Sequence, residues 1–302
     1  METSSLMMEK EAKSSLKGYI ELTKPRITVM ALISAAIGYA CGQKFNPVPI
    51  GYMPMLHLLV GLSFIGAASN TLNQAYEVNL DKSMNRTLDR PIPSGRVSLK
   101  NGYLFGIGCF VIGMVYLLVF SSLQVAFLAF LTIFSYVLVY TPLKTRTSLN
   151  TVAGAFPGAF PVLTGWCAGF GDMHFNGLLI FFIVFVWQLP HFFSISWIYK
   201  EDYKNGGYKM MSLYDETGWQ AVFLILLGTV SLVPVSILPY VYQMASDFYF
   251  FTAILCNCFF LASGLLLLIN RNKFMKQYFY ASIIYLPVLL LVLMLDILGV
   301  QL

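Results

Sequence analysis

The stretch "LLVGLSFIGAASNTLNQAYEVNLD", residues 58–81, decides the fold class, because an apolar run passes directly into a row of polar side chains. The apolar half suits the interior of a bilayer, which a helix crosses with about 20 predominantly apolar residues. The rest of the chain has the same character, since 58% of its 302 residues are hydrophobic and only 11% are charged. Soluble domains carry about a quarter charged residues, so this composition predicts an all-α, polytopic membrane bundle.

Nine apolar segments are long enough to span a membrane, and short polar breaks separate them. They cover residues 27–43, 53–76, 102–120, 122–140, 150–170, 176–198, 219–241, 248–269 and 277–298. We therefore predict a nine-helix membrane domain over residues 27–302, preceded by a cytoplasmic N-terminal tail over residues 1–26.

The basic residues support this span count. With nine spans, every one of the 19 lysines and arginines except Lys44 falls on the same side of the membrane. An excess of Lys and Arg marks the cytoplasmic side. We therefore expect a multi-pass protein of the bacterial inner membrane with a cytoplasmic N-terminus. In a eukaryote, the matrix face of a mitochondrion would be the equivalent side.

The polar half of the opening stretch predicts a cation site. Asn73, Glu77 and Asp81 follow one another at intervals of four residues, so they project from one face of a helix at its cytoplasmic end. Amide and carboxylate oxygens in a row are ligands for a hard cation, and Mg²⁺ in particular bridges carboxylates to substrate phosphates. The alternative is that they only hold helices together through hydrogen bonds. Three acceptors in register favour the ion or phosphate site.

Basic side chains follow this row closely. Arg86 and Arg90 come shortly after Asp81, and arginine binds phosphate with two parallel hydrogen bonds. Further basic residues lie in the cytoplasmic loops that flank the fourth to sixth spans: Lys144, Arg146, Lys200, Lys204 and Lys209. For most of these the topology signal alone is a sufficient explanation, whereas Arg86 and Arg90 are expected to bind phosphate.

A second group of polar residues closes the sixth span, in "WQLPHFFSISWIYKEDYKNGGYKM", residues 187–210. His191 lies about two turns inside the apolar segment, beside Pro190. An ionisable residue within a span is a functional hypothesis. The alternative is a histidine that only hydrogen-bonds within the bundle.

Four runs of the sequence resemble the protoheme IX farnesyltransferase (heme O synthase) family, within the intramembrane prenyltransferases. The runs are "LTKPRIT" (22–28), "NQAYEVNLDKSMNRTLDRPIPSGRVS" (73–98), "YTPLKTRTSLNTVAGAFPGAFPVLTGW" (140–166) and "WQLPHFFSISWIYKEDYKNGGYKMM" (187–211). Residues 84–91 and the WQLPHF run are specific to the heme enzymes, while the spaced acidic pattern indicates only the superfamily.

The resemblance implies a reaction and a set of site residues. Farnesyl diphosphate would donate its farnesyl group to a vinyl group of protoheme IX, water would add, and heme O would pass downstream to a heme A synthase. Mg²⁺ would bind Asn73, Glu77 and Asp81. Asp202 would join these three in catalysis, and His191 and Tyr199 would bind heme. The diphosphate ligands would be Arg86, Arg90, Lys144, Arg146 and Lys204. No nucleic-acid partner is expected.

One departure separates this chain from the general prenyltransferase pattern. Those enzymes carry a second spaced acidic motif after the sixth span, but here Tyr199 and Tyr203 flank Asp202. A second complete Mg²⁺ site is therefore not expected. The tandem repeat GAFPGAFP, residues 154–161, offers either close helix packing or a wall facing the heme, and its two prolines are expected to break the ladder of backbone hydrogen bonds.

Two other functions compete with this interpretation. Another intramembrane prenyltransferase would act on a quinone precursor or a chlorin. A secondary transporter would also place polar groups on a broken helix, but typically near the midplane and with an internal repeat. Here the charges collect at one face, which favours the enzyme.

Overall fold

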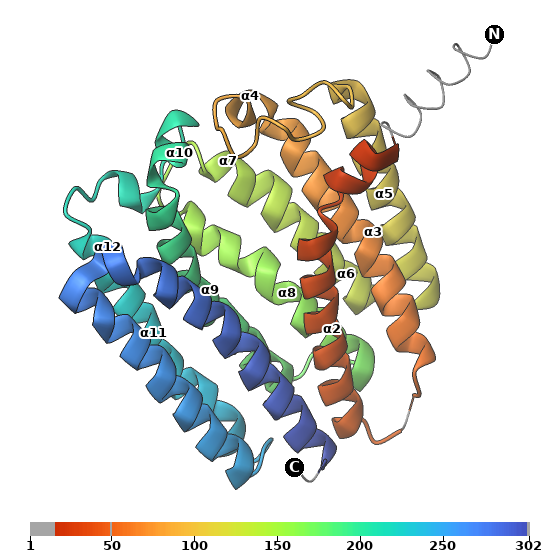
Figure 1. Cartoon of the computed structure of the whole chain (residues 1–302). Helices are drawn as coiled ribbons and strands as arrows, with labels where there is room; N and C mark the ends of the chain where they lie inside the picture. The colour runs from red at the N-terminus through yellow and green to blue at the C-terminus, as the bar shows by residue number, and fades with distance from the viewer. Residues whose placement is uncertain (1–15, 49, 301–302) are drawn as a thin grey trace, which may run out of the picture.

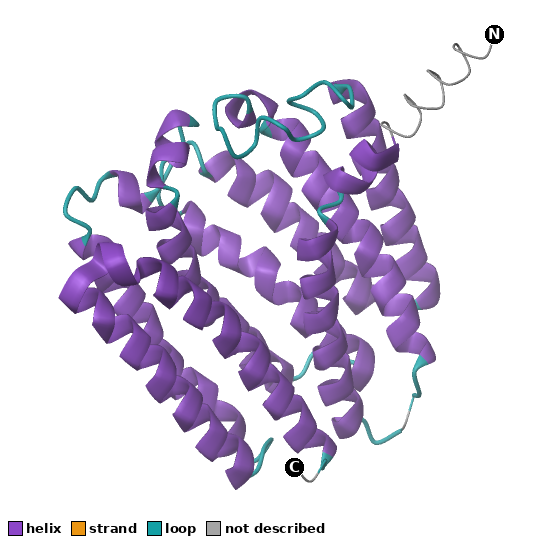
Figure 2. Cartoon of the chain, in the orientation of Figure 1, coloured by secondary structure: helices purple, strands orange, loops and turns teal. Residues whose placement is uncertain are grey.

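The computed structural model describes residues 16–48 and 50–300, and these residues form helices and loops without a strand (Figure 2). After a helical segment over residues 16–22, the elements are α2 (Pro25–Phe45), α3 (Met53–Tyr76), α4 (Val78–Asp81), α5 (Leu99–Phe120), α6 (Leu123–Ile133), the π-helical η1 (Phe134–Tyr140), α7 (Thr141–Leu143), α8 (Asn150–Phe170), α9 (Phe175–Ile198), α10 (Lys200–Asn205), η2 (Met211–Leu213), α11 (Trp219–Val241) and α12 (Asp247–Leu298). The all-α membrane bundle is confirmed. Of the predicted tail, residues 1–15 lie outside the described residues.

All nine predicted segments are helical, although the number of membrane crossings stays a prediction. Seven described helices are long and apolar enough to cross a membrane; α8 is not among them, and α12 contains two of the predicted segments. Within α12, Asn270 leaves the helical conformation with φ −156° and ψ 95°, which bends the chain. The fourth segment runs three residues further than predicted, because η1 continues into α7.

Helix α8 lies in the middle of the bundle and packs most closely against α2. Glycines at four-residue spacing make this approach possible: Gly38 and Gly42 on α2, and Gly165 and Gly169 on α8. A Cβ atom on any of the four would overlap a backbone carbonyl of the facing helix. Small residues at this spacing let helix backbones meet, and lipid-embedded helices associate through such packing because lipid tails are as apolar as leucine.

The GAFP repeat belongs to the same helix and packs closely too. The helix continues through Pro157 and Pro161, which have no N–H and therefore leave its hydrogen-bond ladder without a donor at both positions. Gly154 leaves room for the ring of Tyr140, and Gly158 leaves room for the side chain of Gln188 on α9. Gln188 also donates to the carbonyl of Ala155, at 3.0 Å. These contacts support close helix packing, while the wall facing the heme stays a prediction.

The short elements α4, α7 and α10 lie at the same end of the bundle (Figure 1). The loop after α4 and the loop after α10 meet there, because Met84 packs in one apolar cluster with Tyr208 and Met210. These three side chains are buried. They hold the two loops together over the polar end of α3.

Candidate active site

The row predicted on one helix face exists, but it is built from two helical segments. Helix α3 ends at Tyr76 and α4 begins at Val78, with Glu77 between them at φ −87° and ψ 7°. The i→i+4 pattern continues, since the N–H of Glu77 donates to Asn73 O at 3.0 Å and that of Asp81 donates to Glu77 O at 2.8 Å. The three side chains therefore keep one face. Asn73 is 1% exposed, Glu77 2% and Asp81 0%.

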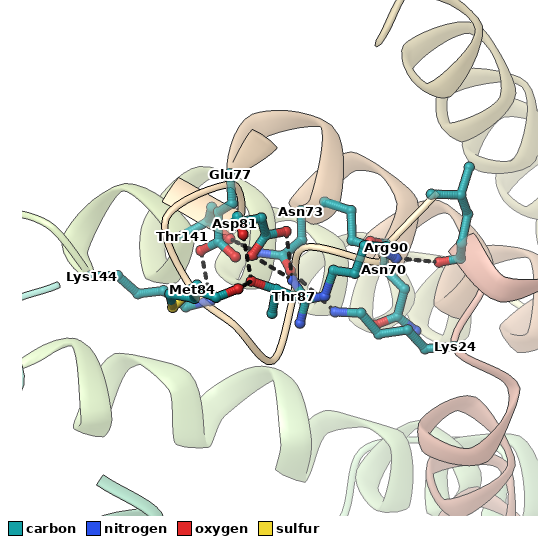
Figure 3. Close-up of polar contacts among 12 residues, drawn as sticks. Lys24, Asn70, Asn73, Glu77, Asp81, Met84, Thr87, Arg90, Thr141 and Lys144 are labelled. Carbon is teal, nitrogen blue, oxygen red and sulfur yellow. Dashed lines mark hydrogen bonds and ion pairs between the residues drawn. The ribbon is translucent and has the colours of Figure 1, made fainter. Parts of the chain in front are cut away.

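Each buried carboxylate is paired with a cation. Lys144 Nζ, just after α7, donates to Glu77 Oε1 at 2.7 Å. Arg90 Nη1 donates to both carboxylate oxygens of Asp81, at 2.8 and 2.6 Å (Figure 3). Thr87 fixes the loop that carries Arg90 by donating to the Asp81 carbonyl at 2.8 Å. A charge taken out of water needs such a partner. The fold therefore brings the two predicted acids together with two of the predicted cations.

A third cation completes the cluster, and in the sequence it stands out only as part of the topology signal. Lys24 Nζ donates to Asn73 Oδ1 at 3.3 Å, opposite the Lys144 side of the cluster (Figure 3). Lys24 sits at the N-cap of α2 with a left-handed backbone, φ 46°. Asn70 holds this turn through the carbonyl of Thr23, at 3.0 Å. The "LTKPRIT" run contains Lys24, so the signal was present.

The surroundings of Lys24 and Lys144 shift the pKa values of these two side chains in opposite directions. Removal from water, together with the charges of Arg90 and Lys144, lowers the pKa of Lys24 to about 7. Burial also lowers the pKa of Lys144, but Glu77 outweighs it and holds that pKa above its ordinary value. Lys144 is therefore a fixed cation, whereas Lys24 titrates near neutral pH.

The remaining predicted residues of the charged end lie outside this buried cluster. Arg86 is exposed, and its guanidinium lies 5.2 Å from the centre of the Tyr199 ring. Arg146 and Lys204 are exposed, and Asp202 is half-buried. No side-chain hydrogen bond joins these three to the buried acids within residues 16–48 and 50–300.

His191 lies apart from the acids, and the polar residues of residues 187–210 do not form one cluster. Gln188 faces α8, as described above, while His191 faces α12. The His191 ring is stacked between Trp187 and Phe279, at centroid distances of 4.7 and 5.2 Å. Its Nδ1 lies 2.7 Å from Ser282 Oγ.

Asn73 is oriented by two groups that the sequence reasoning did not identify. Its Nδ2 donates to Thr141 Oγ1 at 3.0 Å, and its Oδ1 accepts from Tyr136 Oη at 3.4 Å. Both partners belong to the end of the fourth span, 63 and 68 residues away in the sequence. Nothing in local periodicity points to such a distant pairing.

Taken together, the cluster offers three buried oxygen donors surrounded by three cations. This arrangement suits a ligand that is itself a polyanion held partly by a hard metal ion. The profile of the UbiA prenyltransferase family matches residues 29–292 of the sequence. The chain belongs to the UbiA prenyltransferase family. This excludes the secondary-transporter alternative.

The relatives narrow the assignment of this prenyltransferase. The protoheme IX farnesyltransferase of Solibacter usitatus (strain Ellin6076) is 36% identical over 288 residues, which cover 93% of this chain and 99% of the relative. That similarity places the prenyltransferase among the protoheme IX farnesyltransferases, so the predicted resemblance is confirmed.

Solved structures show the same fold. A structure described in a study of digeranylgeranylglyceryl phosphate synthase superposes with a TM-score of 0.80 at 20% identity, over 95% of this chain and 99% of that chain. A UbiA homologue from Archaeoglobus fulgidus, bound to DMAPP and Mg²⁺, gives a TM-score of 0.62 at 17% identity, over 91% of this chain and 98% of that one. The UbiA fold of the prenyltransferase is therefore established.

Proposed function

We propose that this prenyltransferase moves the farnesyl group of farnesyl diphosphate to a vinyl carbon of protoheme IX and so makes heme O. The bond from the allylic carbon to oxygen breaks, and diphosphate leaves with the electron pair. The vinyl carbon forms the new bond, water adds to the resulting cation, and a proton is released. The observation that carries the diphosphate half is the buried cluster of Asn73, Glu77 and Asp81 with Lys24, Arg90 and Lys144. The family supplies the heme half.

The donor set of the cluster fits Mg²⁺. Asn73, Glu77 and Asp81 present an amide oxygen and two carboxylates, which are hard ligands. No group of three His, Cys, Asp or Glu side chains that could hold a metal occurs among the described residues. The protein would thus supply only part of the coordination shell, as is usual for Mg²⁺, which keeps waters and substrate phosphate oxygens. The A. fulgidus homologue bound to DMAPP and Mg²⁺ supports this choice of metal. When bound, the ion would neutralise charge developing on the leaving diphosphate.

The charge balance of the cluster also supports this assignment. When Lys24 is protonated, two buried carboxylates face three cations, which leaves an excess of positive charge. A prenyl diphosphate, with about three negative charges when ionised, and one Mg²⁺ would bring the site close to neutrality. A second Mg²⁺ would need further carboxylates. We assign only Asp202 to that side of the site, which is too few for a second complete Mg²⁺ site.

Lys24, Arg90 and Lys144 would act on the diphosphate by position. In the structure, Arg90 and Lys144 are held against the acids at 2.6–2.8 Å. With a metal on the acids, the same guanidinium and ammonium groups would be free to donate to phosphate oxygens and to stabilise the departing charge. We also assign Arg86, Arg146 and Lys204 to capture of the diphosphate at the surface.

For the heme half we propose His191 and Tyr199. The hydroxyl of Ser282 donates a hydrogen bond to the Phe279 carbonyl, at 2.6 Å. We assign the tautomer in which His191 Nδ1 carries the proton and donates to Ser282 Oγ, 2.7 Å away, because the Ser282 hydroxyl then keeps its bond to Phe279; Nε2 of this neutral imidazole has a free lone pair. That nitrogen is a suitable ligand for heme iron. Tyr199, beneath Arg86, would contact the macrocycle closer to the membrane surface.

We propose that residues 27–302 form the membrane domain in a bacterial inner membrane, with the N-terminus in the cytoplasm and the product passing to a heme A synthase. The support is the basic excess at one end of the bundle. Reporter fusions after Lys100 and Asp172 should report the cytoplasm and the opposite side, respectively, and equal signals at both positions would contradict this topology.

One expression experiment tests the reaction. The chain is produced in a host that lacks its own heme O synthase, and the extracted hemes are identified by mass spectrometry. We expect a hydroxyethylfarnesyl heme with wild type and at most a trace of it with Asp81→Asn. Protoheme alone, with the wild-type protein present in the membrane fraction, would contradict the proposal, and prenylated quinone in its place would support the quinone alternative.

A further inference from the structure

The fourth span ends in a π-helical turn, and two side chains from this turn, Tyr136 and Thr141, hydrogen-bond to Asn73. In η1 the N–H of Thr141 bonds to the carbonyl of Tyr136, five residues back, instead of four as in an α-helix. This spacing places Thr141 next to Tyr136 along the helix, and both side chains reach Asn73 on α3. In an α-helix, Tyr140 would take the place of Thr141.

The hydrogen-bond chain fixes the direction of the contact. Thr141 is 1% exposed, and its hydroxyl donates to the Tyr136 carbonyl at 2.8 Å. A hydroxyl has one proton, so Thr141 Oγ1 can only accept from Asn73, which must present its NH₂ group there. The amide oxygen then points to the other side, where Lys24 Nζ and Tyr136 Oη donate to it. If the amide were flipped, Asn73 Oδ1 would face the acceptor Thr141 Oγ1, and the NH₂ group would face the ammonium of Lys24.

We propose that Thr141 is a positioning residue that holds the amide of Asn73 with Oδ1, and not the NH₂ group, directed at the metal–diphosphate site. The inference rests on the proposed function, because it gives Asn73 Oδ1 the role of a ligand. Removing a residue that orients a metal ligand typically weakens metal binding by about 10–100-fold.

The test measures metal affinity directly. Mn²⁺ stands in for Mg²⁺, and its binding to the purified full-length protein is followed by electron paramagnetic resonance in the presence of unreactive farnesyl thiodiphosphate. Thr141→Val removes the hydroxyl at nearly constant size, and we expect about tenfold weaker Mn²⁺ binding. Thr141→Ser keeps the hydroxyl and should stay within about twofold of wild type.

A matched control separates orientation from stability. Thr164 on α8 is 0% exposed and donates to the Phe160 carbonyl at 2.8 Å, away from the site. Thr164→Val therefore makes the same chemical change, and it should lower the melting temperature without changing Mn²⁺ affinity. Thr141→Val with a lowered melting temperature and unchanged Mn²⁺ affinity would overturn the inference.

The second arm uses Asn73→Asp. A carboxylate has two oxygens and no NH₂ group, so it needs no partner to choose its orientation. In this background Thr141→Val should change Mn²⁺ affinity by less than about twofold, a strong departure from additivity. An equal loss in both backgrounds would overturn the positioning role. Wild type that binds no Mn²⁺ with farnesyl thiodiphosphate would instead overturn the metal site of the proposed function, and the inference with it.

Discussion

Lys144, just after α7, and Glu77, between α3 and α4, form a 2.7 Å ion pair 67 residues apart in the chain, with both side chains almost completely buried. Removing one partner of a buried pair leaves the other charge uncompensated, which costs about 3–5 kcal/mol. We expect Lys144→Met to lower the melting temperature in detergent more than the double change Lys144→Met with Glu77→Gln. Equal melting temperatures for the two variants would show that Glu77 without its partner carries no such penalty.

Asp81→Asn should act mainly on the metal step. The change keeps the size of the side chain and removes the negative charge of one metal ligand, so turnover should fall by about 10²–10³-fold and the Mg²⁺ concentration for half activity should rise. Because Glu77 and Asp81 are proposed to share one ion, Glu77→Gln with Asp81→Asn should cost less than the product of the single effects. If the acids were only links between helices, the melting temperature would fall while the Mg²⁺ midpoint stayed in place.

The affinity for farnesyl diphosphate should depend on pH through Lys24. The pKa of Lys24 is lowered to about 7 by burial and by the charges of Arg90 and Lys144, so its cationic form is lost as pH rises through that value. If only the cationic form binds, the dissociation constant rises with the inverse of its population, about tenfold between pH 6 and pH 8. Calorimetric titration with farnesyl thiodiphosphate at fixed free Mg²⁺ measures this slope.

Lys24→Arg is the matched control, because arginine stays charged over the whole range. Its affinity should vary with pH only as far as the diphosphate itself titrates. A slope as steep as that of wild type would assign the pH dependence to another group.

His191→Ala should weaken heme binding and leave farnesyl diphosphate affinity within about twofold, because its described contacts are to Trp187, Phe279 and Ser282 and not to the acids. Heme titration followed by absorbance measures the first affinity, and calorimetry measures the second. His57→Ala is the control, since His57 bonds Tyr116 instead. Parallel loss of both affinities in folded His191→Ala would contradict this division.

The α2–α8 contact should tolerate no added methyl group. Gly38→Ala would drive a Cβ into the Val162 carbonyl, whereas a Cβ at Gly108 in α5 meets nothing within 4 Å. Overpacking typically costs about 1–3 kcal/mol. Gly38→Ala should therefore lower the melting temperature clearly, and Gly108→Ala should leave it unchanged or slightly raised. A similar response of both variants would show that the contact is loose.

The sequence by itself determined the helices and the row of acids. Hydropathy placed nine apolar segments, and each is helical, because burial in lipid demands that a backbone satisfy its own hydrogen bonds. The spacing of Asn73, Glu77 and Asp81 put them on one face, because a four-residue interval is a local property of the helix. The family runs at residues 73–98 and 187–211 identified the branch, which the relatives confirm.

Only the tertiary structure decided which side chains meet these acids. Of two similar arginines, Arg90 turns inward to Asp81, whereas Arg86 lies outside on Tyr199. The sequence does not predict this difference, because the loop after α4 has no regular periodicity. Lys24 and Thr141 reach Asn73 from distant segments, through a left-handed turn and a π-helical turn. Such pairings depend on how helices pack, and packing is set by long-range contacts such as the glycines of α2 and α8. Hydropathy and helical periodicity describe only neighbours along the chain.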